Sequence, residues 1–122
     1  MTVKIYLRAI KQGDANRLAL FDSNRQGGIN DLKTDVYVGD TVIWKLDFCS
    51  GIKSITKISP KPGNHKVFLS NPKKRLLCTG FTLPIEKGAE GEEEYTIECI
   101  LCDKTEVRID PYIRVLPPPP KD

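Results

Sequence analysis

The chain has 122 residues, of which 39% are hydrophobic and 29% are charged, and its formal net charge is +3. This length and composition predict one folded domain, exclude intrinsic disorder, and remove any need for a metal or a disulfide merely to hold the fold. No run approaches the roughly 20 apolar residues of a membrane helix and no secretory leader is recognisable, so we expect a cytoplasmic protein without membrane association.

A two-residue period dominates the first part of the chain and predicts strands. The run VKIYLRAI alternates apolar and polar residues, and a second strand is expected over residues 17–22. Residues 23–33 have no periodicity and are interpreted as an exposed loop. The next apolar runs, TDVYV and TVIWKLD, predict a hairpin that turns at Gly39 and Asp40.

The second part of the chain continues this pattern, with turns marked by proline, glycine and asparagine. Residues 85–94, IEKGAEGEEE, are interpreted as a loop. No segment keeps the apolar spacing of a stable helix. Strands are expected for IKSITKI, KVFLS, RLLCTGFTL, EYTIECIL, EVRID and YIRVL.

These elements predict an all-β fold, a single Greek-key β-sandwich with antiparallel or mixed sheets over residues 1–116. Residues 117–122, with four prolines, are interpreted as a Pro-rich tail or linker. Alternation within the strands predicts that the inner face includes Val42, Trp44, Leu46, Tyr95, Ile97, Val107, Ile109, Ile113 and Val115.

The run VYVGDTVIWKLD resembles cupredoxin-like domains, in which a V-x-V-G-D-T-V-x-W stretch pairs two core strands around a buried tryptophan. The run EYTIECILCDKTEVRIDPYIRV is similar to the closing strands of that family, and its end also resembles uncharacterised bacterial immunoglobulin-like β-domains. The resemblance implies a cupredoxin-like or immunoglobulin-like sandwich. The histidines that copper requires are missing, because His65 is the single histidine and Met1 the single methionine. We therefore expect no copper and no other cofactor.

Four cysteines are the remaining candidates for metal or redox chemistry: Cys49, Cys78, Cys99 and Cys102. The last two form a C-x-x-C motif, but the other spacings match no standard zinc site. In an extended strand the two thiols of C-x-x-C point to opposite faces, so we expect reduced thiols and no bound metal. A cysteine-ligated metal or redox protein remains an alternative, as does a disulfide between Cys49 and Cys78 in an exported protein.

Enzymatic activity is not expected. His65 lies in a turn beside lysine, away from any nucleophile motif, and Gly27-Gly28 lacks the lysine and hydroxyl residue of a phosphate-binding loop. Charge is segregated, however, because seven basic residues and no acid lie between residues 48 and 85, whereas six acids follow between 86 and 98. The candidate partner-binding residues are Lys53, Lys57, Lys73, Lys74 and Arg75.

Such a basic segment is able to attract nucleic acid, but only Phe68 within it is aromatic, which disfavours base stacking. We expect instead that the basic strands neutralise the acidic strand over residues 92–98 by cross-strand pairs. The function that the sequence favours is a non-enzymatic binding module. Its partner would be another protein or a neighbouring domain, reached through loops or an exposed sheet edge. The oligomeric state stays open.

Overall fold

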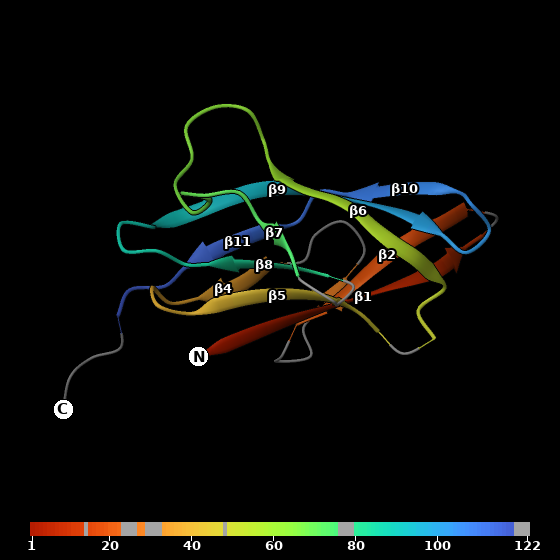
Figure 1. Ribbon diagram of the computed structural model, residues 1–122, viewed down its shortest axis with the longest axis horizontal. Coiled ribbons are helices and arrows are strands. Elements are labelled where there is room, and N and C mark those ends of the chain that lie inside the picture. The colour runs from red at the N-terminus through yellow and green to blue at the C-terminus, as the bar shows by residue number, and fades with distance from the viewer. Residues whose placement is uncertain (14, 23–26, 29–32, 48, 76–79, 119–122) are drawn as a thin grey trace.

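A computed structural model describes residues 1–13, 15–22, 27–28, 33–47, 49–75 and 80–118. All regular elements in these ranges are β-strands, so the all-β prediction is confirmed for this part of the chain (Figure 1). In chain order they are β1 (Thr2–Gln12), β2 (Ala15–Asp22), β3 (Gly27–Gly28), β4 (Lys33–Val36), β5 (Thr41–Leu46), β6 (Ile52–Pro60), β7 (Lys73–Lys74), β8 (Phe81–Pro84), β9 (Gly91–Leu101), β10 (Glu106–Ile109) and β11 (Tyr112–Val115).

The first sheet has the strand order β3-β2-β1-β5-β8-β7. β1 is antiparallel to β2 and parallel to β5, which places Ile5 opposite Trp44. Alternation in β1 follows the sequence pattern, with Val3, Ile5 and Leu7 buried. The N-terminal strand is therefore internal to the sheet, and its apolar face contributes to the core.

The second sheet has the order β10-β9-β11-β4, with β6 paired to the other side of β9. β9 organises this sheet because different parts of it pair with three strands. Residues 97–100 pair with β10, residues 91–94 pair with β11, and residues 95–101 pair with β6. β11 in turn runs parallel to β4, so this sheet is also mixed.

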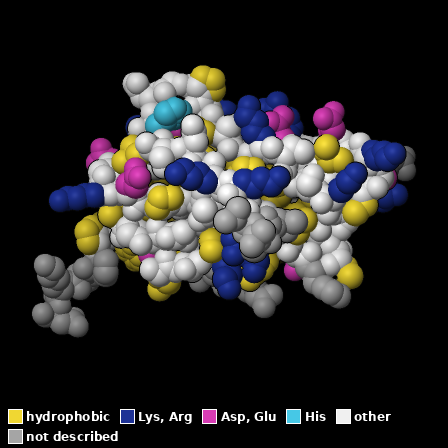
Figure 2. Space-filling view, in the orientation of Figure 1, with side chains coloured by type: hydrophobic (Ala, Val, Ile, Leu, Met, Phe, Trp, Pro, Cys, Tyr) yellow, Lys and Arg dark blue, Asp and Glu magenta, His cyan; other side chains and the backbone are white. Residues whose placement is uncertain are grey.

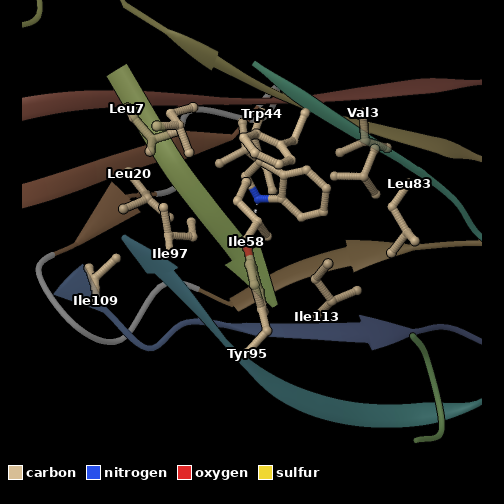
Figure 3. Packing of buried hydrophobic residues seen from close by; sticks show 14 of the residues in the cluster. Val3, Leu7, Leu20, Trp44, Ile58, Leu83, Tyr95, Ile97, Ile109 and Ile113 are labelled. Atoms are coloured by element: carbon tan, nitrogen blue, oxygen red, sulfur yellow. Dashed lines mark hydrogen bonds between the residues drawn. The ribbon is translucent and has the colours of Figure 1, made fainter. Parts of the chain in front are cut away.

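One hydrophobic core lies between the two sheets, as in a β-sandwich (Figure 3). Trp44 from the first sheet and Tyr95 from the second are both fully buried and meet at its centre. The predicted inner face is confirmed. Six of its residues are buried (Val42, Trp44, Tyr95, Ile97, Ile109 and Ile113), and Leu46, Val107 and Val115 pack against the core while partly exposed.

The predicted hairpin at Gly39 and Asp40 is wrong. β4 pairs with β11 in the second sheet, whereas β5 pairs with β1 and β8 in the first, so residues 37–40 cross between sheets. The carboxylate of Asp40 accepts the backbone N–H of Tyr37 at 2.9 Å, and the N–H of Asp40 donates back to the Tyr37 carbonyl. These bonds close the crossing turn locally, without a ladder between the flanking strands.

The predicted strand over residues 66–70 is also wrong, because this segment is a series of bends. The N–H groups of Lys66, Val67 and Phe68 all donate to Oε1 of Glu93, at 2.9, 2.8 and 3.0 Å. A single carboxylate thus satisfies three consecutive donors that would otherwise have needed a neighbouring strand.

The acidic run before Tyr95 is a strand where the sequence predicted a loop. β9 begins at Gly91, and Glu92, Glu93 and Glu94 pair with residues of β11. The long β9 therefore includes both the acidic run and the apolar run that follows it.

Pairing in the second sheet continues past β11, since the N–H of Leu116 donates to the carbonyl of Val36 at 2.8 Å. Pro117 and Pro118 are exposed and lie in no strand. Within the described residues, no helix has the length and apolar character needed to cross a membrane.

Candidate functional site

Exposed apolar side chains gather at one end of the molecule. Among the described residues, the large hydrophobic side chains with substantial exposure are Met1 at 89%, Tyr37 at 38%, Val38 at 47% and Leu69 at 43%. The N-terminus, the crossing turn and the loop between β6 and β7 that carry them all lie on the left-hand side of Figure 1. We call these four residues the apolar end.

Backbone hydrogen bonds hold the crossing turn at this end. The N–H of Gly39 donates to the carbonyl of Ile85 at 2.9 Å, and the N–H of Ile85 donates to the carbonyl of Asp40 at 2.8 Å. The N–H of Thr41 donates to the carbonyl of Met1 at 2.9 Å. Tyr37 and Val38 are therefore presented on a turn that is tied both to the loop after β8 and to β1.

The loop after β8 also meets the segment that carries Leu69. A methyl group added to Gly88 would lie 3.7 Å from Cδ1 of Leu69, so Leu69 packs beside this loop. The N–H of Glu90 donates to the carbonyl of Lys66 at 3.0 Å. The loop after β8 therefore contacts both the crossing turn and the segment that carries Leu69.

Glu93 fixes the segment that presents Leu69. Its side chain is only 10% exposed, one oxygen accepts the three N–H groups described above, and the other lies 2.9 Å from Nδ1 of His65. Burial alone would raise the pKa of this carboxyl, but the N–H donors of Phe68, Val67 and Lys66, with His65, lower it below its ordinary value. The charged carboxylate is thus the stable form and acts as a structural anchor.

The rim of the apolar end carries charges of both signs. Lys66 and Lys87 are exposed, as are Glu86 and Glu90, so two bases and two acids flank the apolar residues. Further along the second sheet, Lys33 binds Glu92 at 2.9 Å. The charges of the rim therefore balance, and the rim favours neither a cationic nor an anionic partner.

The predicted basic residues are divided between the two sheets. Lys53 and Lys57 lie on β6, whereas Lys73 and Lys74 form β7 at the edge of the first sheet and Arg75 follows it. On the face that Figure 2 shows, lysine and arginine side chains are spread out rather than joined in one cluster.

The expected pairing of the basic strands with the acidic strand occurs at one position of the register. Lys57 lies opposite Glu98, and on the other side of β9 Arg108 also lies opposite Glu98. The acids at residues 92–94, however, pair with β11 and not with β6, and Glu92 lies opposite Arg114. Glu92 thus neighbours Lys33 and Arg114 rather than the bases of β6, and the guanidinium of Arg114 itself pairs with Asp35.

The cysteines occupy different environments. Cys99 is buried in the core, and burial raises the pKa of its thiol to about 12. Cys49 and Cys102 are exposed free thiols on turns, and Cys78 lies outside the described residues. The two cysteines of the C-x-x-C motif therefore do not face a common site.

A small open hollow of about 170 Å³ lies on the second sheet near the β6 irregularity. Its lining includes two acids and one base, and Glu98 lies opposite Arg108 in the pairing of β9 with β10. The lining includes one thiol, that of Cys99, but burial raises the pKa of this thiol and keeps it protonated at neutral pH. The lining residues are Thr56, Glu98, Cys99, Glu106, Val107 and Arg108.

Comparison with protein-family models and with curated proteins gives no match for this chain.

Proposed function

We propose that this chain is a non-enzymatic binding module with a cupredoxin-like β-sandwich fold that lacks the copper ligands, and that it binds another protein through the apolar end. The observation that carries the proposal is the gathering of Met1, Tyr37, Val38 and Leu69 on adjoining loops. Scattered exposed hydrophobic residues are normal on a protein surface, whereas a group of them at one place indicates a contact surface.

The composition of this surface suits a protein partner. Protein interfaces combine an apolar centre, often containing tyrosine, with a polar rim that stays in contact with water. Tyr37 and the aliphatic side chains supply the centre, and residues 86–90 with Lys66 supply the rim. The balanced rim disfavours nucleic acid, whose binding depends on an excess of basic residues near phosphates.

Two of the sheet edges, β6 and β7, are poorly suited to binding a partner by strand addition. β7 consists of two lysines, and β6 carries exposed lysines and two register shifts along its pairing with β9. Short, charged or bulged edges are how natural proteins prevent strand addition. Of the two routes that the sequence left open, loops are the better supported.

The fold part of the proposal is supported by the two facing mixed sheets and by Trp44, which is buried as the sequence resemblance requires. Copper chemistry is disfavoured by the residues themselves. His65, the single histidine, already contacts Glu93.

A photocrosslinking experiment tests this function. A photoreactive residue is placed at Val38, at Leu69 or, as the control, at Thr56, an exposed residue of β6, and each protein is added to a lysate of the native host. We expect the same host protein to be crosslinked from Val38 and Leu69 but not from Thr56. Unlabelled wild-type protein should compete, whereas the double variant Val38→Asn, Leu69→Asn should not. Equal crosslinking from all three positions, or equal competition by the variant, would refute the proposal.

A further inference from the structure

Two exposed cysteines lie on two connected turns at the end of the molecule opposite the apolar end. Cys49 lies in the connection from β5 to β6, and Cys102 lies in the turn from β9 to β10, both on the right-hand side of Figure 1. The N–H of Cys102 donates to the carbonyl of Gly51 at 2.9 Å, next to the cross-strand pair of Ile52 and Leu101. The two turns therefore extend the pairing of β6 with β9.

The backbone geometry limits how far apart the two cysteines can be. The hydrogen bond from the N–H of Cys102 to the carbonyl of Gly51 places these two residues side by side at the end of the β6–β9 pairing. Cys49 is two residues from Gly51, so its Cα lies within roughly 7.6 Å of that of Gly51. A disulfide needs Cα atoms about 4.4–6.8 Å apart, so bond formation requires the turn at residues 49–51 to fold towards Cys102.

This turn has a conformation that favours such a change. Cys49 has a φ of 52°, a left-handed conformation that residues with a Cβ rarely adopt, and Gly51 has a φ of 77°. A strained residue two positions before a glycine can move to a more ordinary conformation without breaking a strand. Two hydrogen bonds at Ser50 would oppose the movement: its carbonyl accepts the N–H of Ala9 at 2.7 Å, and its hydroxyl oxygen accepts the N–H of Ile52 at 3.2 Å.

The third described cysteine does not compete for this bond. Cys99 is 1% exposed and packs in the core, and burial raises the pKa of its thiol to about 12, so little of it is present as the nucleophilic thiolate at neutral pH. The C-x-x-C spacing in the sequence is consequently not the redox pair. The two exposed thiols come from residues that are 53 positions apart in the sequence (102 − 49), on turns joined by the hydrogen bond from Cys102 to Gly51.

We propose that Cys49 and Cys102 form a reversible disulfide by exchange with a low-molecular-weight disulfide such as glutathione disulfide. One cysteine thiolate attacks a sulfur of glutathione disulfide, forms a mixed disulfide and releases one glutathione thiolate. The thiolate of the other cysteine then attacks the protein sulfur of the mixed disulfide and releases the second glutathione. Two protein thiols are oxidised and one glutathione disulfide is reduced to two thiols, so atoms and electrons balance.

The bond would fasten the start of β6 to the end of β9. It would join two turns that are held by one described hydrogen bond, and reducing conditions would release them. This site is separate from the apolar end, so the inference does not depend on the proposed protein partner.

Mass spectrometry of the intact and the digested protein tests the inference. The reduced protein is equilibrated with mixtures of reduced and oxidised glutathione, then alkylated under acid-quenched conditions. We expect the wild-type protein to lose the mass of two hydrogens and to yield a linked peptide pair containing Cys49 and Cys102. The Cys78→Ser variant should behave in the same way, with the midpoint at the same glutathione ratio.

The single variants provide matched controls. Cys49→Ser and Cys102→Ser should each lose the internal bond and retain a glutathione adduct on the remaining exposed cysteine. A linked peptide that contains Cys78, stable glutathione adducts on both exposed cysteines of the wild type, or no oxidation at all would each overturn the proposal. Circular dichroism of every variant shows whether the strands are intact, which separates chemistry from misfolding.

Discussion

The indole N–H of Trp44 donates a hydrogen bond to the phenol oxygen of Tyr95, 3.0 Å away, at the centre of the core. The two rings are also in edge contact, with centroids 5.6 Å apart, and Phe68 packs on the other side of Tyr95. Burial raises the pKa of Tyr95 well above its ordinary value, so the phenol stays protonated. One polar contact thus links the two sheets inside an apolar core.

Replacing Tyr95 with phenylalanine should destabilise the protein by about 1–3 kcal/mol, because the buried indole N–H of Trp44 loses its acceptor. Urea unfolding followed by tryptophan fluorescence measures this change, since Trp44 is the single tryptophan. The matched control is Tyr6→Phe, at a half-buried position of β1, for which we expect a change of less than about 0.5 kcal/mol. Equal effects would show that the contact contributes little.

Glu93→Gln should lower the free energy of unfolding by about 1–2 kcal/mol at neutral pH, because charged acceptors form the stronger hydrogen bonds. The folded-state pKa of Glu93 is below the ordinary 4.5, so its contribution is complete above that value and is lost as pH falls through the lower folded pKa. The variant should therefore show a flatter decline in stability between about pH 5 and pH 3.

Chemical denaturation at a series of pH values provides the measurement for Glu93. Glu92→Gln is the control, because Glu92 is 37% exposed and its ion pair with Lys33 is worth only about 0.2–1 kcal/mol. If the free energy of unfolding falls equally with decreasing pH in wild type and in Glu93→Gln, the anchoring role is contradicted.

Ile55→Lys should prevent folding or cost more than about 3 kcal/mol, since it places an unpaired charge in the core. Thr56→Lys should change stability by less than about 0.5 kcal/mol, because Thr56 is exposed. Side chains alternate between the two faces of a regular strand, so a regular strand that buries Ile58 would also bury Thr56 and would expose Ile55. Denaturation curves for both variants therefore report directly on the irregular register of β6, and the reverse order of effects would disprove it.

Changing Glu92 and Glu94 together to lysine should cost about 0.4–2 kcal/mol, because exposed cross-strand and ion pairs each contribute about 0.2–1 kcal/mol. The loss should shrink in Lys33→Gln and Arg114→Gln backgrounds and stay the same in a Lys57→Gln background, since Glu92 neighbours the first two bases.

Wild-type protein should show no measurable binding to nucleic acid by fluorescence anisotropy at low salt. A submicromolar, strongly salt-dependent complex would restore the basic segment as a binding surface.

The sequence predicted most strands because their apolar residues alternate, and it failed where another interaction replaced a strand ladder. Ile52, Ile55 and Ile58 recur every third residue, a spacing that a regular strand cannot bury, and two register shifts bring all three inside. Residues 66–70 have a strand composition, but Glu93, far along the chain, accepts the N–H groups of the first three of them.

The crossing turn shows the same limit. Gly39 and Asp40 match a hairpin turn, and only the distant partners of β4 and β5 place the two strands in different sheets. The apolar end likewise could not be found from the sequence, because its members are ordinary hydrophobic residues of three separate segments. Exposed residues such as Val38 and Leu69 become conspicuous only after the fold has buried the others.

The two parallel pairings, of β1 with β5 and of β4 with β11, also determine how the chain acquires its structure. Each joins strands that are far apart in sequence, and long loops must close before such contacts stabilise anything. Folding should therefore take milliseconds to seconds, as is usual for all-β domains with many non-local contacts. During that time β4 lacks its partner β11, and the lysines of β6 and β7 help to keep incomplete sheets from associating with one another.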